Sequence, residues 1–210
     1  MGRKSLKDVR QKQILKVFYN LAKTEGLENT SIAKIAKEMG VNPSLIIHYF
    51  DTKEDLTYRL IDYILDKYGL IFAKGKFIAL DSRDSLFRII DDIFSKKWNT
   101  LFDDSLFYSC YALTFRDAQC KAMYKSLLDS LRTTLCSHIE QCVNDGFSRV
   151  KDAAEVADNI FVLVDGAYFY LSLVDDKKEY ERKRQRYKQQ AMTMLDLVLV
   201  PKVNLGLAAN

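Results

Sequence analysis

Hydrophobic positions in residues 30–56 recur with the spacing of short α-helices. Four of them fall at i, i+3, i+4 and i+7 on one helix face: Ile32, Ile35, Ala36 and Met39. Gly40 can adopt the left-handed backbone that ends a helix, and Asn42 followed by Pro43 supplies a cap and a first helical residue. A second helix is therefore expected over 43–49, joined to the first by a tight turn.

The rest of the chain predicts one helix after another. An apolar stripe that includes Phe18 indicates a helix over about 6–24, and Asp51 with Glu54 is a cap signal before a helix near 53–73. Further helices are expected near 83–102, 104–116, 119–145, 153–175 and 178–200. Only two prolines and eight glycines occur in 210 residues, which favours long helices over many short strands. The pattern predicts an all-α protein with a flexible tail over 203–210.

Positive charge is concentrated in the N-terminal quarter. Residues 1–50 hold nine Lys and Arg against four Asp and Glu, a net charge of +5, whereas the whole chain carries +4. This excess beside a helix-turn-helix pattern favours binding to a phosphate backbone over the alternative of a solvated helical hairpin. A second basic run, Lys177–Lys188, also contains glutamates and is interpreted as a solvated helix face, with a second nucleic-acid surface as the alternative.

Other chemistry is sparse in the sequence. The cysteines and histidines lack metal-ligand spacing, so no metal and no cofactor are expected, and the thiols are interpreted as buried, with a redox pair as the alternative. They are Cys110, Cys120, Cys136, Cys142, His48 and His138. The absence of a nucleophile–base pair or a phosphate-binding loop disfavours an enzyme. No signal sequence or membrane span is recognised, which predicts a cytoplasmic protein without membrane contact.

A set of residues at fixed spacing carries a family resemblance. They are Thr30, Ser31, Ile35, Ala36, Gly40, Val41, His48, Tyr49, Phe50, Lys53, Glu54 and Leu56. This motif resembles the DNA-binding part of the TetR family of bacterial transcriptional regulators. Residues 105–124 and 145–173 are also similar to the BetI-like subgroup. The resemblance implies an N-terminal three-helix helix-turn-helix domain over 1–52 and a larger C-terminal helical domain for ligand sensing and dimerisation over 53–202.

The function that the resemblance implies is a homodimeric repressor. It would bind a palindromic double-stranded DNA operator and release it with a small-molecule effector, which the many aromatic residues suggest is apolar or aromatic. Three alternatives stay open: an activator of the same fold, a redox-responsive regulator, and a helical protein–protein adaptor. The effector, the operator and the regulated genes are not encoded in any recognisable pattern.

The resemblance also assigns DNA-binding positions. Pro43, Ser44 and Ile47 match positions that face base edges, and Asn42 caps their helix. The positions that match phosphate contacts are Thr30, Ser31, His48, Tyr49 and Lys53. The family often has Lys-Gly at 43 and 44 and tyrosine at 47, so apolar contact between Ile47 and a thymine methyl group becomes the expected mode of reading.

Two further sets of residues are predicted for the C-terminal domain. The effector pocket is expected to be lined by Trp98, Phe102, Phe107, Tyr108, Tyr111, Phe115, Phe161, Asp165 and Tyr168. An aromatic stripe at helical spacing is also compatible with plain core. The dimer interface is expected to use the last two helices, through Ile160, Val164, Ala167, Leu171, Met192, Leu195 and Leu199. These apolar faces are wide enough to serve both the chain's own core and a partner.

Overall fold

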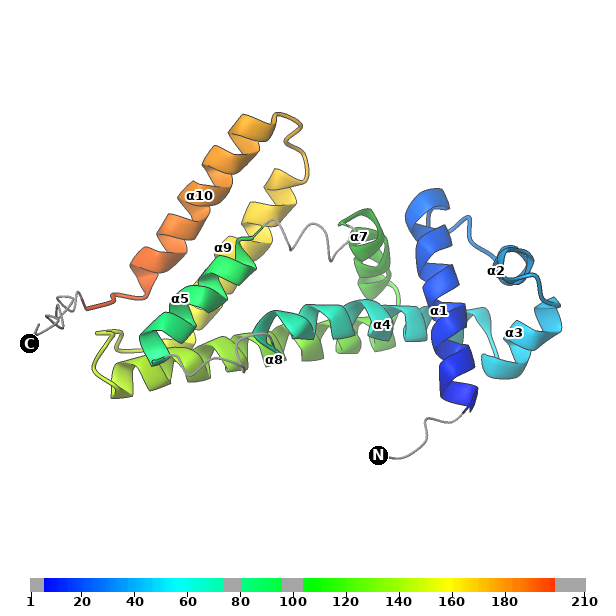
Figure 1. Cartoon of the computed structure of the whole chain (residues 1–210), viewed down its shortest axis with the longest axis horizontal. Helices are drawn as coiled ribbons and strands as arrows, with labels where there is room; N and C mark the ends of the chain where they lie inside the picture. The colour runs from blue at the N-terminus through cyan, green and yellow to red at the C-terminus, as the bar shows by residue number, and fades with distance from the viewer. Residues whose placement is uncertain (1–5, 74–80, 96–103, 199–210) are drawn as a thin grey trace, which may run out of the picture. The chain divides into compact units, whose positions relative to one another are not determined.

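The computed structural model describes residues 6–73, 81–95 and 104–198, with side chains described up to residue 66 in the first range (Figure 1). Its helices are α1 (Leu6–Glu25), α2 (Ile32–Met39), α3 (Pro43–Tyr49), α4 (Lys53–Ala73), α5 (Ser82–Ile93), α7 (Asp104–Ala112), the 3₁₀ helix η2 (Leu113–Phe115), α8 (Ala118–Asn144), α9 (Ala153–Leu171) and α10 (Lys177–Met194). Across these ranges the single β-type pairing is an isolated bridge between Ser148 and Leu197. The all-α prediction is confirmed.

The contacts between residues divide the chain into two compact units. The first combines the described residues within 1–71 and 96–130, and therefore holds α1 to α3, most of α4, α7 and the start of α8. The second combines those within 72–95 and 131–210, and therefore holds α5, the rest of α8, α9 and α10. Helix α8 contributes residues to both units.

The first unit has a core that follows the predicted apolar faces. Fully buried side chains of α1, α2, α3, α4 and the residue after α3 include Ile14, Phe18, Ile35, Ala36, Ile46, Phe50, Leu56 and Leu60. Their periodicity along each helix packs the two short helices, α2 and α3, on each other and on α1, because helices of seven and eight residues are not stable alone. Figure 1 shows α2 and α3 beside α1.

The N-terminal helix boundaries follow the sequence closely, with one change of cap. Helix α4 starts at Lys53 as predicted, but its cap is Thr52, whose hydroxyl oxygen accepts the N–H of Asp55 at 3.0 Å. Asp51, the predicted cap, lies one residue earlier. The predicted helix over 104–116 is divided into α7 and η2.

The predicted helix over 83–102 is too long, and the second unit shows why. Helix α5 ends at Ile93, and side chains from distant helices bind its last carbonyls. The hydroxyl of Tyr168 donates to the Ile93 carbonyl at 2.7 Å, and the guanidinium of Arg184 donates to the carbonyl of Phe94. Carbonyls at a helix end need such partners when they are buried. Residues 96–103 of that prediction lie outside the described residues.

Candidate nucleic-acid interface

Two local caps shape the turn between α2 and α3. Ser31 begins α2 by accepting a hydrogen bond from the backbone N–H of Lys34 at 3.3 Å. Gly40 ends α2 with φ +63°, and the N–H of Val41 donates to the carbonyl of Ala36 at 3.0 Å. Any other residue is strained in this left-handed backbone, so the turn depends on glycine at position 40.

Helix α3 presents most of the residues predicted to read DNA. Its cap is Asn42, whose Oδ1 accepts the backbone N–H of Ser44 at 3.0 Å. Ile46 is fully buried and fixes the inner face of the helix, while Ile47 is 51% exposed. The exposed side chains on this side are Asn42, Pro43, Ser44, Ile47 and His48. A half-exposed isoleucine on so short a helix gives the surface an apolar contact point between polar neighbours.

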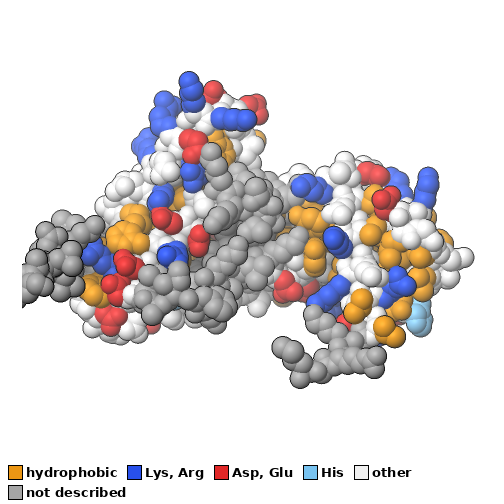
Figure 2. Space-filling model, in the orientation of Figure 1, with side chains coloured by type: hydrophobic (Ala, Val, Ile, Leu, Met, Phe, Trp, Pro, Cys, Tyr) orange, Lys and Arg blue, Asp and Glu red, His pale blue; other side chains and the backbone are white. Residues whose placement is uncertain are grey.

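The remaining predicted positions border this face. Tyr49 is half-buried, and its ring meets the ring of His48 edge to face at a centroid distance of 5.1 Å. Ser31 and Lys53 are exposed at the starts of α2 and α4. Lys and Arg side chains lie over the region of α1 to α3, with apolar side chains between them (Figure 2). This mixture of cations and apolar groups suits a nucleic-acid surface.

Thr30 is the exception, and its predicted phosphate contact needs correction. Its side chain is 1% exposed, and its hydroxyl donates to the carbonyl of Gly26 at 2.9 Å. Its N–H donates to the carbonyl of Leu27 at 3.4 Å. Both donors are therefore used inside the α1–α2 connection, which Thr30 holds in shape instead of binding an outside ligand.

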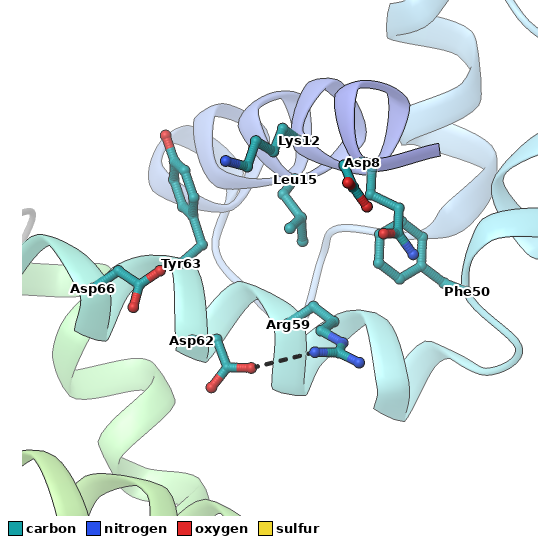
Figure 3. Close-up of a pocket in the computed structure, with 9 residues that line it drawn as sticks. Asp8, Lys12, Leu15, Phe50, Arg59, Asp62, Tyr63 and Asp66 are labelled. Carbon is teal, nitrogen blue, oxygen red and sulfur yellow. Dashed lines mark ion pairs between the residues drawn. The ribbon is translucent and has the colours of Figure 1, made fainter. Parts of the chain in front are cut away.

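A cleft of about 460 Å³ lies between α1 and α4, which sequence reasoning did not find (Figure 3). Leu15 and Phe50 contribute apolar lining, and charged residues of both signs surround it. Arg59 forms an ion pair with Asp62 at 3.8 Å; partial burial raises the pKa of Asp62, and the nearby Arg59 opposes that rise. Gln11, also in the lining, donates to the carbonyl of Tyr49 at 3.1 Å and so holds the end of α3 against α1.

A second cleft, of about 290 Å³, lies beside the first turns of α4. It is lined by residues from the α1–α2 turn, α4, η2 and the start of α8, including Lys53. Inside it the hydroxyl of Tyr58 donates to Oδ2 of Asp117 at 2.6 Å. This hydrogen bond raises the pKa of Tyr58 to about 12 and lowers the pKa of Asp117. The pair joins the start of α4 to the start of α8.

Comparison with known families assigns both parts of the chain. Residues 14–59 match the family model described as bacterial regulatory proteins, tetR family. Residues 81–197 match the model described as the tetracyclin repressor-like C-terminal domain. This chain belongs to the TetR family. The helix-turn-helix is therefore the DNA-binding element of a TetR-family transcriptional regulator, as its motif predicted.

Individual relatives agree with this assignment. HTH-type transcriptional regulator BetI 1 of Chromohalobacter salexigens is 22% identical over 186 residues, covering 88% of this chain and 90% of that protein. An HTH-type transcriptional regulator of Staphylococcus aureus strain USA300 is 39% identical over 74 residues, covering 35% of this chain and 40% of that protein. BetI regulators, to which the later segments were predicted to be similar, are thus homologues over most of the chain.

Solved structures share the fold. A TetR transcription regulator from Haloarcula marismortui has a TM-score of 0.78 at 21% identity and covers 91% of this chain and 100% of its own. A transcriptional regulator from Saccharomonospora viridis, solved in complex with choline, has a TM-score of 0.75 at 20% identity and covers 92% of this chain and 100% of its own.

The residues predicted for a TetR-type dimer interface lie mostly inside the chain's own core. Five are no more than 3% exposed: Ile160, Val164, Ala167, Leu171 and Leu195. Because the chain's own core covers these five side chains, they expose almost no surface to a partner, and their assignment is corrected to core. Met192 is half-buried, and Leu199 lies outside the described residues. On the other face of α9 and just beyond its end, Val162, Phe169 and Leu173 are 60%, 62% and 71% exposed.

The residues predicted for the effector pocket fall into both units. In the first, Phe107 stacks on Tyr111 at a centroid distance of 6.5 Å, and both rings contact Tyr124. Tyr108 packs edge to face on Phe107, and Phe115 does so on Tyr111 although it is 78% exposed. Tyr124 was not predicted, and its place in an aromatic cluster follows from tertiary packing.

The other pocket predictions belong to the second unit. Arg132 lies over the ring of Phe161 at 5.1 Å and pairs with Asp158 at 2.9 Å and Asp165 at 3.4 Å. Burial raises the pKa of Asp165, and Arg132 opposes that rise. Tyr168 is the residue that binds the end of α5. Trp98 and Phe102 lie outside the described residues.

Three of the four cysteines, Cys110, Cys120 and Cys142, are buried as predicted, whereas Cys136 is half-buried. Cys110 and Cys120 are buried, and burial raises the pKa of the first to about 12 and of the second to about 11. A thiol that stays protonated at neutral pH is a poor nucleophile, which disfavours the redox-responsive alternative. Among the described residues, no group of three or more His, Cys, Asp or Glu side chains is arranged to hold a metal ion. No helix in the described ranges has the length and apolar character needed to cross a membrane.

Proposed function

We propose that this TetR-family regulator is a homodimeric repressor that acts in the bacterial cytoplasm. It binds a palindromic operator and releases it when a small-molecule effector binds. The observation that carries the proposal is the outer face of α3, where Ser44, Ile47 and His48 are exposed while Ile46 anchors the helix from behind. A helix fixed in this way can enter the major groove as a unit.

The contacts proposed for this face divide into two kinds. Ser44 and Ile47, with Pro43, face base edges and set the preferred sequence. The residues proposed to contact phosphates are Ser31, His48, Tyr49 and Lys53. Phosphate contacts supply much of the affinity and fix the register without reading sequence. One helix of seven residues meets few base pairs, so discrimination among genomic sites requires a second copy.

The second copy is proposed to dock on the outer face of α9. Val162, Gly166 and Phe169 follow one another at i, i+4 and i+7, which places them along one side of α9, and Leu173 lies just beyond its end. Val162, Phe169 and Leu173 expose large apolar groups. A twofold dimer buries the same stripe from both copies. Two α3 helices must lie about one turn of DNA apart, roughly 34 Å, to read the two halves of a palindromic operator.

The effector is proposed to be a small apolar or aromatic molecule. The aromatic cluster of Phe107, Tyr111 and Tyr124 supports this, because aromatic walls are typical of small-molecule sites. The choline complex of the Saccharomonospora viridis neighbour adds a quaternary ammonium to the compounds worth testing, since ring faces also attract cations. Release requires that the effector binds better to the form of the dimer that does not fit DNA.

Selection of DNA fragments from a random pool by the purified protein tests the proposal directly. The expected result is an inverted repeat that is protected on both half-sites, bound by a dimer in sedimentation at micromolar concentration. Titration of candidate compounds, with operator release and the fluorescence of Trp98 followed in parallel, should give one apparent affinity for both signals. A monomer that binds a single half-site tightly would overturn the dimeric reading.

A further inference from the structure

One hydrogen bond ties the first turns of α4 to the start of α8. Tyr58 and Asp117 are 59 residues apart in sequence, yet the Tyr58 hydroxyl donates to Oδ2 of Asp117 at 2.6 Å. Tyr58 follows Lys53 by five residues, about one and a half helical turns. Lys53 and Tyr58 line the same cleft, so the bond lies close to the lysine proposed to contact a phosphate.

Asp117 is held in one orientation by its own helix start. Its Oδ1 accepts the N–H of Cys120 at 2.8 Å, as a cap of α8 does, and its N–H donates to the carbonyl of Leu113 at 2.9 Å. The carboxylate can therefore turn little without losing the cap. Next to Tyr58 on α4, the hydroxyl of Thr57 donates to the Lys53 carbonyl at 2.8 Å. This bond connects the backbone of Lys53 to the residue beside Tyr58, so a shift of Tyr58 moves the first turn of α4.

The protonation states of Tyr58 and Asp117 keep this hydrogen bond formed at neutral pH. The hydrogen bond raises the pKa of Tyr58 to about 12 and lowers the pKa of Asp117. The donor thus keeps its proton and the acceptor its charge at the pH of any DNA-binding assay. Hydrogen bonds to a charged acceptor are among the stronger ones, and one of them is sufficient to choose between nearby positions of a helix end.

We propose that Tyr58 and Asp117 are positioning residues for DNA binding, because their hydrogen bond holds the first turn of α4 where Lys53 meets an operator phosphate. The inference rests on the proposed phosphate contact of Lys53. Neither residue touches DNA in this account. Both residues act by positioning Lys53. This role differs from that of residues that only stabilise the fold.

A double-mutant cycle on the full-length protein tests this. Tyr58→Phe removes one hydroxyl and keeps the ring, so operator affinity measured by fluorescence anisotropy should fall about tenfold, the size of one good hydrogen bond. The slope of affinity against salt, measured between about 50 and 200 mM, should become shallower by about one unit, as for the loss of a phosphate contact. In a Lys53→Ala background, Tyr58→Phe should cause no further loss in either quantity.

Two variants serve as matched controls. Ser148→Ala removes another buried hydroxyl, one that donates to the Leu195 carbonyl at 2.8 Å and belongs neither to α4 nor to a proposed binding site. It should lower thermal stability while leaving operator affinity unchanged. In Asp117→Asn the amide oxygen can keep the cap while the amide N–H donates to the Tyr58 hydroxyl, so a neutral hydrogen bond replaces the charged one and operator binding should weaken less than in Tyr58→Phe.

The outcomes separate the two levels of the proposal. A tenfold loss that persists in the Lys53→Ala background, or an equal loss in Ser148→Ala, would overturn the positioning role and leave DNA binding by α3 intact. A wild-type protein that selects no DNA sequence at all would refute the proposed function itself.

Discussion

At the start of α3, the backbone N–H and the hydroxyl of Ser44 both donate to one side-chain oxygen of Asn42. Oδ1 of Asn42 accepts the backbone N–H of Ser44 at 3.0 Å and its hydroxyl at 2.9 Å. The one proton of that hydroxyl is therefore committed, and what Ser44 can offer to a base edge is its lone pairs. In the major groove, the amino groups of adenine and cytosine are the donors that such an acceptor fits.

The cap and the sequence preference should therefore change together in Asn42→Ala. Loss of the cap is expected to lower the free energy of unfolding by about 1 kcal/mol. The freed Ser44 hydroxyl can then donate to a base acceptor, so the base selected opposite it should shift. Asn42→Ser keeps a capping oxygen and is the control for stability. Thermal unfolding and selection from a random pool measure the two effects, and an unchanged base preference would remove Ser44 from the reading set.

Substitutions of Ile47 and Lys53 should affect DNA binding differently, the first through sequence discrimination and the second through overall affinity. Ile47→Ala removes an exposed apolar group from the reading face, so discrimination at one base pair, expected to be a thymine, should fall by about 1–3 kcal/mol while other sequences bind as before. Lys53→Ala should weaken binding to all sequences and flatten the salt slope by about one unit. Competition between operator and random duplex at several salt concentrations distinguishes them. Ile47→Ala with undiminished specificity would argue against reading by methyl contact.

Two valines on opposite faces of α9 allow the proposed dimer interface to be tested with matched substitutions. Val162 is 60% exposed and Val164 is 3% exposed, so one substitution at both sites tests surface against core. Val162→Glu should give a folded monomer with weak operator affinity, because a dimer would bury the new charge. Val164→Glu should lower the free energy of unfolding by several kcal/mol, because the charge lies in the chain's own core. Sedimentation and circular dichroism score each variant; a dimeric Val162→Glu would place the interface elsewhere.

The helix-turn-helix was predicted well from the sequence, because the hydrogen bonds that shape it join residues close together in the chain. Ser31, Gly40 and Asn42 act within a few residues of their partners, so the caps and the bounds of α2 and α3 are written in short motifs. The faces of α9 were harder, because this helix is apolar nearly all round and periodicity does not say which side is inside. The choice between Val162 and Val164 depends on the neighbours that cover one side.

Contacts between residues far apart in the sequence explain most of the other differences between prediction and structure. The end of α5 carries no glycine or proline, and it is set by Tyr168 and Arg184, which lie far along the chain. The predicted contact of Thr30 with phosphate failed for a local reason, since its hydroxyl found the carbonyl of Gly26 one turn earlier. The Tyr58–Asp117 bond follows no motif, because each residue alone is ordinary.

The same bond predicts a pH dependence of stability. The pKa of Asp117 is lowered in the folded state, so its contribution is present above the ordinary carboxyl value of 3.8 and is lost as pH falls through the lower folded value. The pKa of Tyr58 is raised from 10.0 to about 12, so that contribution is present below pH 10 and lost as pH rises through 12. The stability advantage of the wild type over Tyr58→Phe in urea unfolding should therefore be flat between about pH 5 and 9 and shrink on both sides. A steady slope across neutral pH would contradict this assignment.

Tyr168 was predicted to line the effector pocket, and its hydrogen bond instead assigns it a measurable structural role. Its hydroxyl is buried against the Ile93 carbonyl at 2.7 Å, so Tyr168→Phe removes this donor and should lower the free energy of unfolding by about 1–3 kcal/mol. The ring stays in place, stacked beside Phe94, so the concentration of effector that releases half of the operator should not change. Tyr111→Ala is the informative contrast, because it removes a ring of the aromatic cluster in the first unit. There the effector concentration should rise. Should Tyr168→Phe alter release and Tyr111→Ala leave it unchanged, the effector site belongs with α5 and α9 instead of the cluster around Phe107.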